Sequence, residues 1–194
     1  IVEPMSEKAL IESIRVEMRQ HYAQGEKYLL VTPGNYGAEY VKEKADLPFE
    51  RNMKCSNYVG ETIDMAIDMG VEGILFVAHI GKFVKVAAGI MNTHSHSADG
   101  RMEVLASNGI RAGAPLSCAK EILEAGTTDE ALTILKEYGY LEKTMKEIME
   151  RIQFYLNHRS YEQILLGAVV FSNGHGYLGQ TEDAEELIKR IRKQ

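Results

Sequence analysis

The stretch Gly73-Ile-Leu-Phe-Val-Ala78, followed by His79-Ile-Gly-Lys82, decides the fold of this 194-residue chain. An uncharged run that opens on a glycine and closes on a polar turn is typical of a strand buried on both faces. Similar runs occupy Tyr28–Thr32 and Ile164–Phe171, a weaker strand pattern occupies Asn52–Ser56, and helical patterns lie between them. We therefore expect a three-layer, Rossmann-like α/β domain with a mostly parallel sheet of about four strands and flanking helices.

The helical patterns have recognisable ends. Ser6 is suited to cap the first helix, and Thr181 the last, because a hydroxyl accepts from the free N–H groups of a first turn. A helix of small and apolar residues is expected from Phe83 to about Met91. The longest helix, Leu141 to about His158, carries an apolar stripe rich in methionine that we interpret as core. We find no repeat or linker, so residues 1–194 are expected to form a single domain.

Composition excludes several classes of protein. The chain has 22 basic and 28 acidic residues, and this net charge of −6 argues against binding to nucleic acid or to a membrane surface. Its longest apolar stretch, 73–91, is broken by basic residues and does not predict a spanning helix. Cys55 and Cys118 have no neighbouring cysteine, so neither a disulfide framework nor a thiolate metal site is expected. No leader pattern is found, and a soluble, cytoplasmic protein is predicted.

Polar and glycine-rich turns follow each expected strand. In an open parallel sheet, ligands bind beyond the carboxyl ends of the strands, and glycines allow backbone N–H groups to approach them. The turn Pro33–Gly37 matches neither a Walker loop nor G-x-G-x-x-G, and a plain Pro-Gly turn is the alternative. By topology we predict a cofactor site formed by Gly34, Asn35, Tyr36, Gly37, Asn57 and Gly60.

The densest polar segment is Asn92-Thr-His-Ser-His-Ser-Ala-Asp-Gly-Arg101. The region Gly73–Arg101 has three basic residues and one acidic residue, a net charge of +2 within an acidic chain. A polar capping loop is one interpretation. A second is a metal-dependent hydrolase, because His94-x-His96 with Asp99 resembles the H-x-H-x-D-H ligands of metallo-β-lactamase hydrolases. Asp99 comes one residue too late for that pattern, and the further ligands are guesses among His79, His175, Asp99 and Glu103.

The whole segment His79–Arg101 resembles the signature of the CbiD family, the cobalt-precorrin-5B C1-methyltransferases of anaerobic cobalamin biosynthesis. The blocks Ile1–Ser6, Thr32–Gly37 and Ser56–Gly60 are similar to other blocks of that family and occur in its order. Members of the family are about twice as long, and their N-terminal part, which has a Thr-Thr-Gly block, matches nothing here. The resemblance is therefore to the C-terminal part, with that N-terminal part as an expected partner.

The resemblance implies transfer of a methyl group from S-adenosylmethionine to C-1 of a cobalt-containing corrinoid, with Tyr36 and Tyr58 as candidates for an aromatic face at the sulfonium. No protein-bound metal is expected, because the cobalt arrives with the substrate. The acetate and propionate groups of the corrinoid require cationic and hydroxyl donors. We predict catalytic roles for His94, His96 and Asp99, and substrate binding by His79, Lys82, Lys85, Thr93, Ser95, Ser97 and Arg101. A corrinoid-binding module without activity of its own is the alternative, and the residues leave the oligomeric state open.

Overall fold

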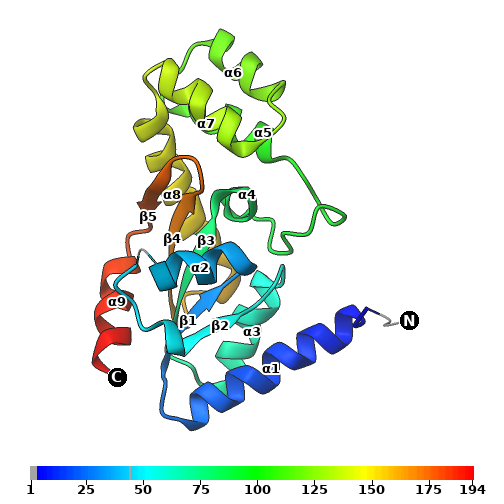
Figure 1. The fold of residues 1–194 in the computed structure, drawn as a ribbon, viewed down its shortest axis with the longest axis vertical. Coiled ribbons are helices and arrows are strands. Elements are labelled where there is room, and N and C mark those ends of the chain that lie inside the picture. Colours follow the sequence, from blue (N-terminus) through cyan, green and yellow to red (C-terminus); the bar gives the residue numbers. More distant parts are fainter. Residues whose placement is uncertain (1–3, 44) are drawn as a thin grey trace.

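A five-stranded sheet forms the centre of the molecule (Figure 1). The computed structural model describes residues 4–43 and 45–194, and within them the strand order is β2-β1-β3-β4-β5. Strands β1 to β4 run parallel, and β5 pairs antiparallel with β4. The strands are β1 (Tyr28–Thr32), β2 (Asn52–Lys54), β3 (Gly73–His79), β4 (Leu165–Ser172) and β5 (Gly176–Gln180).

The predicted number of about four strands is one too low, because the sequence analysis did not identify β5. This strand contains Gly176 and Gly179, both with positive φ, and its side chains are at most half-buried. With two glycines and one aliphatic side chain, it lacks the continuous apolar run by which β1, β3 and β4 are recognised. A tight turn after Ser172 returns the chain along β4, and the antiparallel pairing follows from that turn.

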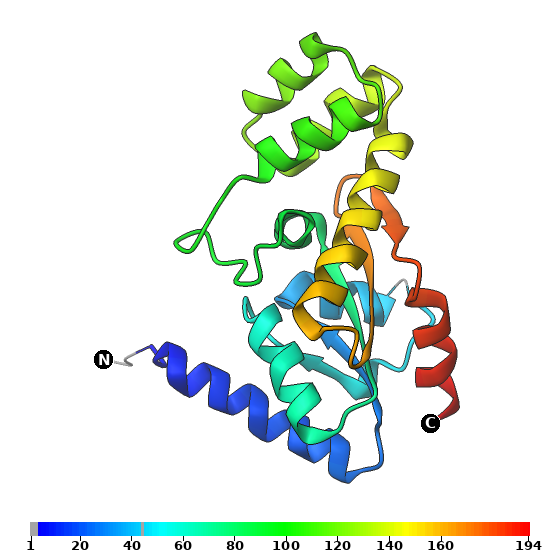
Figure 2. The same ribbon diagram turned by 180° about the vertical axis from the view of Figure 1, so that it is seen from behind.

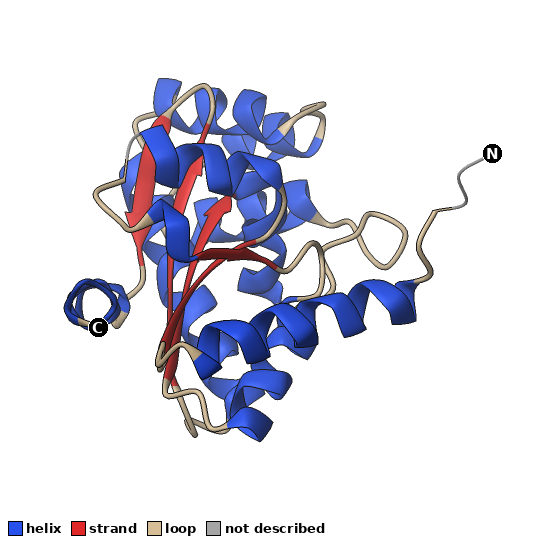
Figure 3. Cartoon of the chain, turned by 60° about the horizontal axis from the view of Figure 1, so that its bottom comes forward, coloured by secondary structure: helices blue, strands red, loops and turns tan. Residues whose placement is uncertain are grey.

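Helices cover both faces of the sheet (Figures 2 and 3). Helices α2 and α9 pack against one face, and α1, α3 and α8 against the other. The described helices are α1 (Glu7–Ala23), α2 (Asn35–Glu43), α3 (Val59–Met69), α4 (Ile80–Phe83), α5 (Arg101–Arg111), α6 (Leu116–Leu123), α7 (Thr128–Glu137), α8 (Leu141–Ser160) and α9 (Ala184–Lys193), with the 3₁₀ turns η1 (Phe49–Arg51) and η2 (Val84–Ala88). None of them has the length and apolar character needed to cross a membrane.

Local structure agrees with some expectations and corrects others. The Ser6 hydroxyl accepts from the amide of Ala9 at 3.2 Å, so the first cap is confirmed. Thr181 is not the cap of the last helix, because its Oγ1 accepts from the amide of Ala168 at 2.9 Å and α9 begins at Ala184. The expected helix at 83–91 is instead the short turns α4 and η2, which end where Gly89 adopts a φ of +79°. Both cysteines are free and buried.

The parallel strands reverse their order between β1 and β3. The chain places β2 on one side of β1 and then crosses to add β3 on the other side. Connections that leave in opposite directions open a crevice at the carboxyl ends of these two strands, where ligands of doubly wound sheets bind. Helices α5, α6 and α7 form a separate group beyond this edge, and α8 runs from that group along the sheet (Figures 1 and 2).

Candidate functional site at the carboxyl edge of the sheet

The turns after β1 and β3 meet at the crevice. Gly34 follows β1 with a φ of +78°, and a Cβ placed on it would lie 3.1 Å from Cε of Lys82. Lys82 belongs to α4, directly after β3. A side chain at position 34 would therefore press on the Lys82 stem, and the glycine allows the lysine to cross the turn. Gly34, a predicted cofactor-binding residue, and Lys82, a predicted substrate-binding residue, therefore meet here.

Asn57 connects Lys82 to the polar segment 92–101. Its Oδ1 accepts from Nζ of Lys82 at 2.6 Å and from Oγ1 of Thr93 at 3.1 Å. The amide of Thr93 also donates to the carbonyl of Asn57 at 3.0 Å. Burial lowers the pKa of the half-buried Lys82, since the charged ammonium loses solvation. Lys82, Asn57 and Thr93 thus form one hydrogen-bonded cluster, which we call the Lys82 cluster.

Lys85 lies beneath the polar segment. Its side chain is 3% exposed, and Nζ donates to the carbonyls of Thr93 at 3.1 Å and Ala98 at 2.8 Å. Burial lowers the pKa of this lysine, and the nearby Asp99 carboxylate opposes that effect. One ammonium therefore joins the two ends of the segment 93–98, whereas the sequence led us to expect its charge at the substrate.

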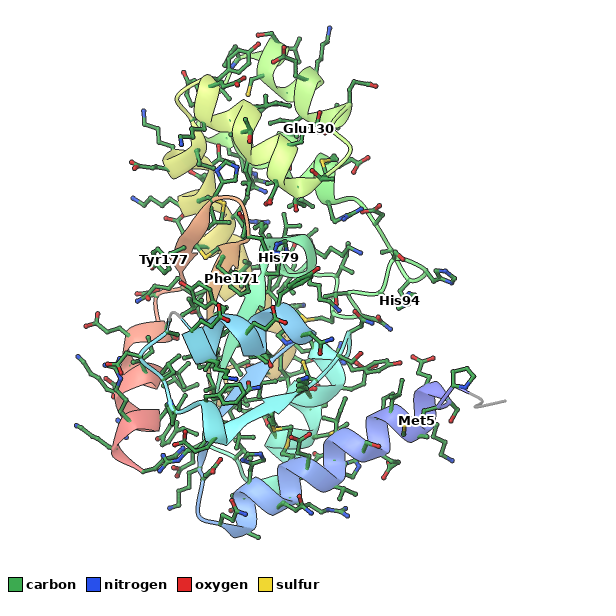
Figure 4. All side chains as sticks on the ribbon, in the orientation of Figure 1. Met5, His79, His94, Glu130, Phe171 and Tyr177 are labelled. Atoms are coloured by element: carbon green, nitrogen blue, oxygen red, sulfur yellow. The ribbon has the colours of Figure 1, made fainter. Side chains whose placement is uncertain are left out.

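The tip of the segment presents its side chains to solvent. His94, Ser95, His96 and Ser97 are all exposed, and His94 projects well away from the sheet (Figure 4). The imidazole rings of His94 and His96 are 4.9 Å apart, and Nδ1 of His94 accepts from the amide of His96 at 3.1 Å. The amides of Ser97 and Ala98 donate to the His94 carbonyl, which closes a tight turn.

Asp99 and Arg101 form an ion pair at the exit of the segment. Nε of Arg101 lies 2.8 Å from Oδ1 of Asp99, and this bond lowers the pKa of the carboxyl group. The arrangement agrees in geometry with an aspartate that orients the guanidinium. Among residues 4–43 and 45–194, no three His, Cys, Asp or Glu side chains gather as a metal site would need, so the hydrolase alternative lacks a third ligand there.

His79 occupies the centre of the edge, at the end of β3 (Figure 4). Its Nδ1 accepts from the amide of Gly81 at 3.0 Å, which leaves the proton of the neutral ring on Nε2. The ring lies 5.6 Å from that of Tyr36 and 5.6 Å, edge-on, from that of Phe171. Burial lowers the pKa of His79, and the carboxylate of Asp129 in α7 opposes the shift.

The predicted cofactor residues divide into two groups. Asn35 and Tyr36 are exposed at the edge, where Oδ1 of Asn35 accepts from Lys54 at 2.9 Å. Gly37 is buried, and a Cβ there would lie 2.4 Å from the carbonyl of Val77. A Cβ at Gly60 would lie 2.7 Å from the guanidinium of Arg159. These last two glycines serve close packing in the structure.

Sequence reasoning overlooked the part of the edge contributed by Asp129 and Phe171. Phe171 was expected only as the last residue of a strand, and Asp129 was not among the candidate residues. No local pattern marks either residue, because their approach to His79 depends on how α7 and β4 pack. Of the resembling block Ile1–Ser6, residues 1–3 lie outside the described residues.

Comparison with known proteins places this geometry in a family. Residues 92–182 match the model of the CbiD C-terminal domain. Over its whole length the chain is 41% identical to a cobalt-precorrin-5B C(1)-methyltransferase of Ruminiclostridium cellulolyticum and covers 52% of it. It is 36% identical to the protein of that name from Alkaliphilus metalliredigens, of which it covers 51%. It is 35% identical over 99% of its length to the Tolumonas auensis protein, of which it also covers 51%.

The chain thus spans about half the length of the curated relatives it matches. No solved structure matches it significantly. The matched region 92–182 includes the exposed histidines, the Asp99–Arg101 pair and β4. The chain is therefore similar over its whole length to cobalt-precorrin-5B C(1)-methyltransferases, and its residues 92–182 match the C-terminal domain of the CbiD family.

Proposed function

We propose that this chain is the C-terminal part of an enzyme that transfers a methyl group from S-adenosylmethionine to C-1 of cobalt-precorrin-5B in cobalamin biosynthesis. The observation that carries the proposal is the 41% identity, over the whole chain, to a relative with that name. The cobalt would arrive with the corrinoid, and no protein-bound metal is needed. The Lys82 cluster supports a ligand site in this half, since it lies at the reversal of strand order.

The residues at the edge fit both reactants by their chemistry. An ammonium has three N–H donors, and the bond described for Lys82 uses one of them. The others are suited to a carboxylate, which S-adenosylmethionine and the corrinoid side chains both carry. The exposed ring of Tyr36 beside His79 offers an aromatic face to a sulfonium. When bound, S-adenosylmethionine supplies the methyl group.

The protein's main task in such a displacement is alignment and exclusion of water, so no nucleophilic side chain is required. We assign binding of the corrinoid carboxylates to Lys82, Ser95, Ser97 and Arg101, with Asp99 orienting Arg101. Thr93, which the sequence predicted to bind substrate, is buried and donates its hydroxyl proton to Asn57, so we assign it the positioning of Asn57. His94 and His96 are placed to move a proton at the exposed tip, and His79 to donate through Nε2–H. Lys85 positions the segment from below. Gly34, Asn35, Tyr36 and Asn57 form the side that faces the methyl donor.

We also propose that the chain is one three-layer, Rossmann-like domain. A single cluster of buried apolar side chains runs from the sheet, through α8, to Leu105, Ile122 and Leu132 of the helical group. A continuous core of this kind argues against an independent helical domain.

The proposal is tested in the full-length enzyme by Lys82→Met. Loss of a charge-assisted hydrogen bond costs about 1.5–3 kcal/mol, so kcat/KM for methylation of cobalt-precorrin-5B should fall roughly 10- to 100-fold. Lys120→Met, on the exposed side of α6, is the matched control and should keep normal kinetics. Normal kinetics in Lys82→Met would reject the site.

A binding module without activity is a second candidate, favoured by the coverage of only about half of each relative. Calorimetry with S-adenosylhomocysteine distinguishes the two. Binding to the full-length enzyme that Tyr36→Ala weakens supports the cofactor side proposed here. Binding that is insensitive to Tyr36→Ala argues for the methyl donor in the other half and leaves this half to hold the corrinoid.

A further inference from the structure

The outward face of α8 is hollowed along much of its length. A groove of about 820 Å³ runs along α8 beside β5 and is lined by Met145, Met149, Phe154 and Leu178, among others. A second hollow of about 390 Å³ begins at Phe154 and extends to Tyr161. A third, of about 590 Å³, continues from Tyr161 to Met91. Neighbouring hollows share lining residues and so adjoin one another along α8, and we call the three together the α8 furrow.

Aromatic side chains stand exposed in the α8 furrow. Phe154 is 53% exposed and Tyr161 is 81% exposed, although Ile152 and Leu156 on the opposite face of α8 are fully buried. Tyr161 and Glu162 adopt left-handed backbone conformations, with φ of 51° and 57°. Such conformations are unfavourable for side chains other than glycine, and here they end the helix with an aromatic ring held in solvent. Exposed aromatic residues in a groove are typical of an interaction surface.

The open edge of the sheet borders the same furrow. Within the described residues, β5 pairs with β4 on one side, and Leu178, Gly179 and Gln180 of β5 line the groove. Folded proteins usually cover an edge strand, since its free N–H and C=O groups invite pairing. An edge strand and an exposed aromatic face side by side indicate one partner that covers both.

We infer that the remaining half of the longer protein binds in the α8 furrow and covers it. The relatives have about as many residues outside this chain as inside it, so a second unit of similar size is available to every copy. This inference rests on the length of the relatives and not on the proposed methyl transfer.

Charge argues against a second copy of this chain as the occupant. The groove is lined by Glu142, Glu150 and Glu182 against one basic residue, Lys146. Two copies paired through this face would bring acidic rims together, whereas a segment with apolar and basic residues would complement it. The structure therefore favours a basic, partly apolar segment from the other half.

Hydroxyl-radical footprinting of the full-length protein tests the inference. Phe154 and Tyr161 should be oxidised at least about tenfold more slowly than their intrinsic reactivities and their exposure in this chain predict. Tyr22, 39% exposed on α1, and Leu116, 63% exposed on α6, are internal controls that should react as their exposure predicts. Reaction of Phe154 and Tyr161 at the exposed rate would overturn the inference. So would protection that appears only at high protein concentration, because it would assign the furrow to a second copy.

A variant that introduces negative charge into the α8 furrow gives an independent readout. In the full-length protein, Phe154→Asp with Tyr161→Asp should speed hydrogen exchange of the peptide 176–182 at least about tenfold, since the covering segment is lost. Leu116→Asp is the matched control, a similarly exposed apolar residue on α6, and should leave that peptide unchanged. Unchanged exchange in the double variant would contradict the inference whether or not the enzyme methylates its substrate.

Discussion

Lys85 illustrates how one buried side chain can organise an exposed site. Its ammonium satisfies two backbone carbonyls, of Thr93 and Ala98, and the exposed residues between them carry both candidate catalytic histidines. The desolvation of a lysine is costly unless hydrogen bonds compensate it. Lys85 is nevertheless buried in the folded protein. This burial fits a role in fixing the shape of the segment rather than in contacting a ligand.

We expect Lys85→Met to weaken the fold and to loosen this segment. Methionine can fill the buried space of the lysine stem but leaves two carbonyls without a donor, at about 1–3 kcal/mol of the free energy of unfolding. Chemical denaturation measures the loss, and limited proteolysis should cut within residues 93–98. Lys120→Met, on the surface of α6, is the control. An unchanged unfolding free energy together with a protease-resistant segment would contradict this role for Lys85.

His79 should make stability depend on pH. Burial lowers its pKa from the ordinary value of 6.5, so the unfolded chain binds a proton at a higher pH than the folded one. Its contribution to stability is therefore fully present above pH 6.5 and is lost as the pH falls through the lowered pKa. Denaturation between pH 7.5 and pH 5 should show a shallower loss of stability in His79→Gln than in the unaltered chain. Equal slopes in the two proteins would refute the assignment.

Glycines in two helices show that the same substitution can have opposite effects. In α2, a Cβ at Gly37 would lie 2.4 Å from the Val77 carbonyl, so Gly37→Ala must displace the helix from β3 and should cost about 1–3 kcal/mol. In α5, the nearest atom to a Cβ at Gly109 is a methyl carbon of Leu135 at 3.4 Å. Gly109→Ala should therefore be neutral or stabilise the helix by up to about 1 kcal/mol. Thermal unfolding of both variants checks this, and a Gly37→Ala protein as stable as Gly109→Ala would contradict the packing argument.

At the scale of elements, the sequence predicts what local chemistry determines. β3 and α8 were recognised because burial imposes an apolar run on a central strand and a stripe on a helix. β5 and the role of Thr181 were missed because both depend on a pairing with β4 that no local pattern records. The same limit applies to the site: its polar residues are visible in the sequence, but the direction in which the Lys85 side chain points is set by packing.

In the whole molecule, the candidate site lies where two groups of elements meet. The turn at the start of α7 contacts the carboxyl edge of the sheet, and Oδ2 of Asp129 accepts from the amide of Gly174 at 3.1 Å. His175 adds contacts from Nε2 to the Asp129 carbonyl at 3.2 Å and to Oγ1 of Thr133 at 3.1 Å. Burial lowers the pKa of His79, and the Asp129 carboxylate opposes this shift. The position of the helical group is therefore coupled to the protonation of His79 at the carboxyl edge of the sheet.

This coupling predicts the behaviour of Asp129→Ala. The substitution removes the acceptor for the Gly174 amide, which should cost about 1 kcal/mol and leave the turn between β4 and β5 less firmly held by α7. Hydrogen exchange should therefore quicken in the peptides covering 126–133 and 173–176 together, while α1 and β1 keep their protection. Glu137→Ala, exposed at the other end of α7, is the matched control. If exchange quickened in 126–133 alone, Asp129 would serve only the start of its own helix and the two groups of elements would not be joined through it.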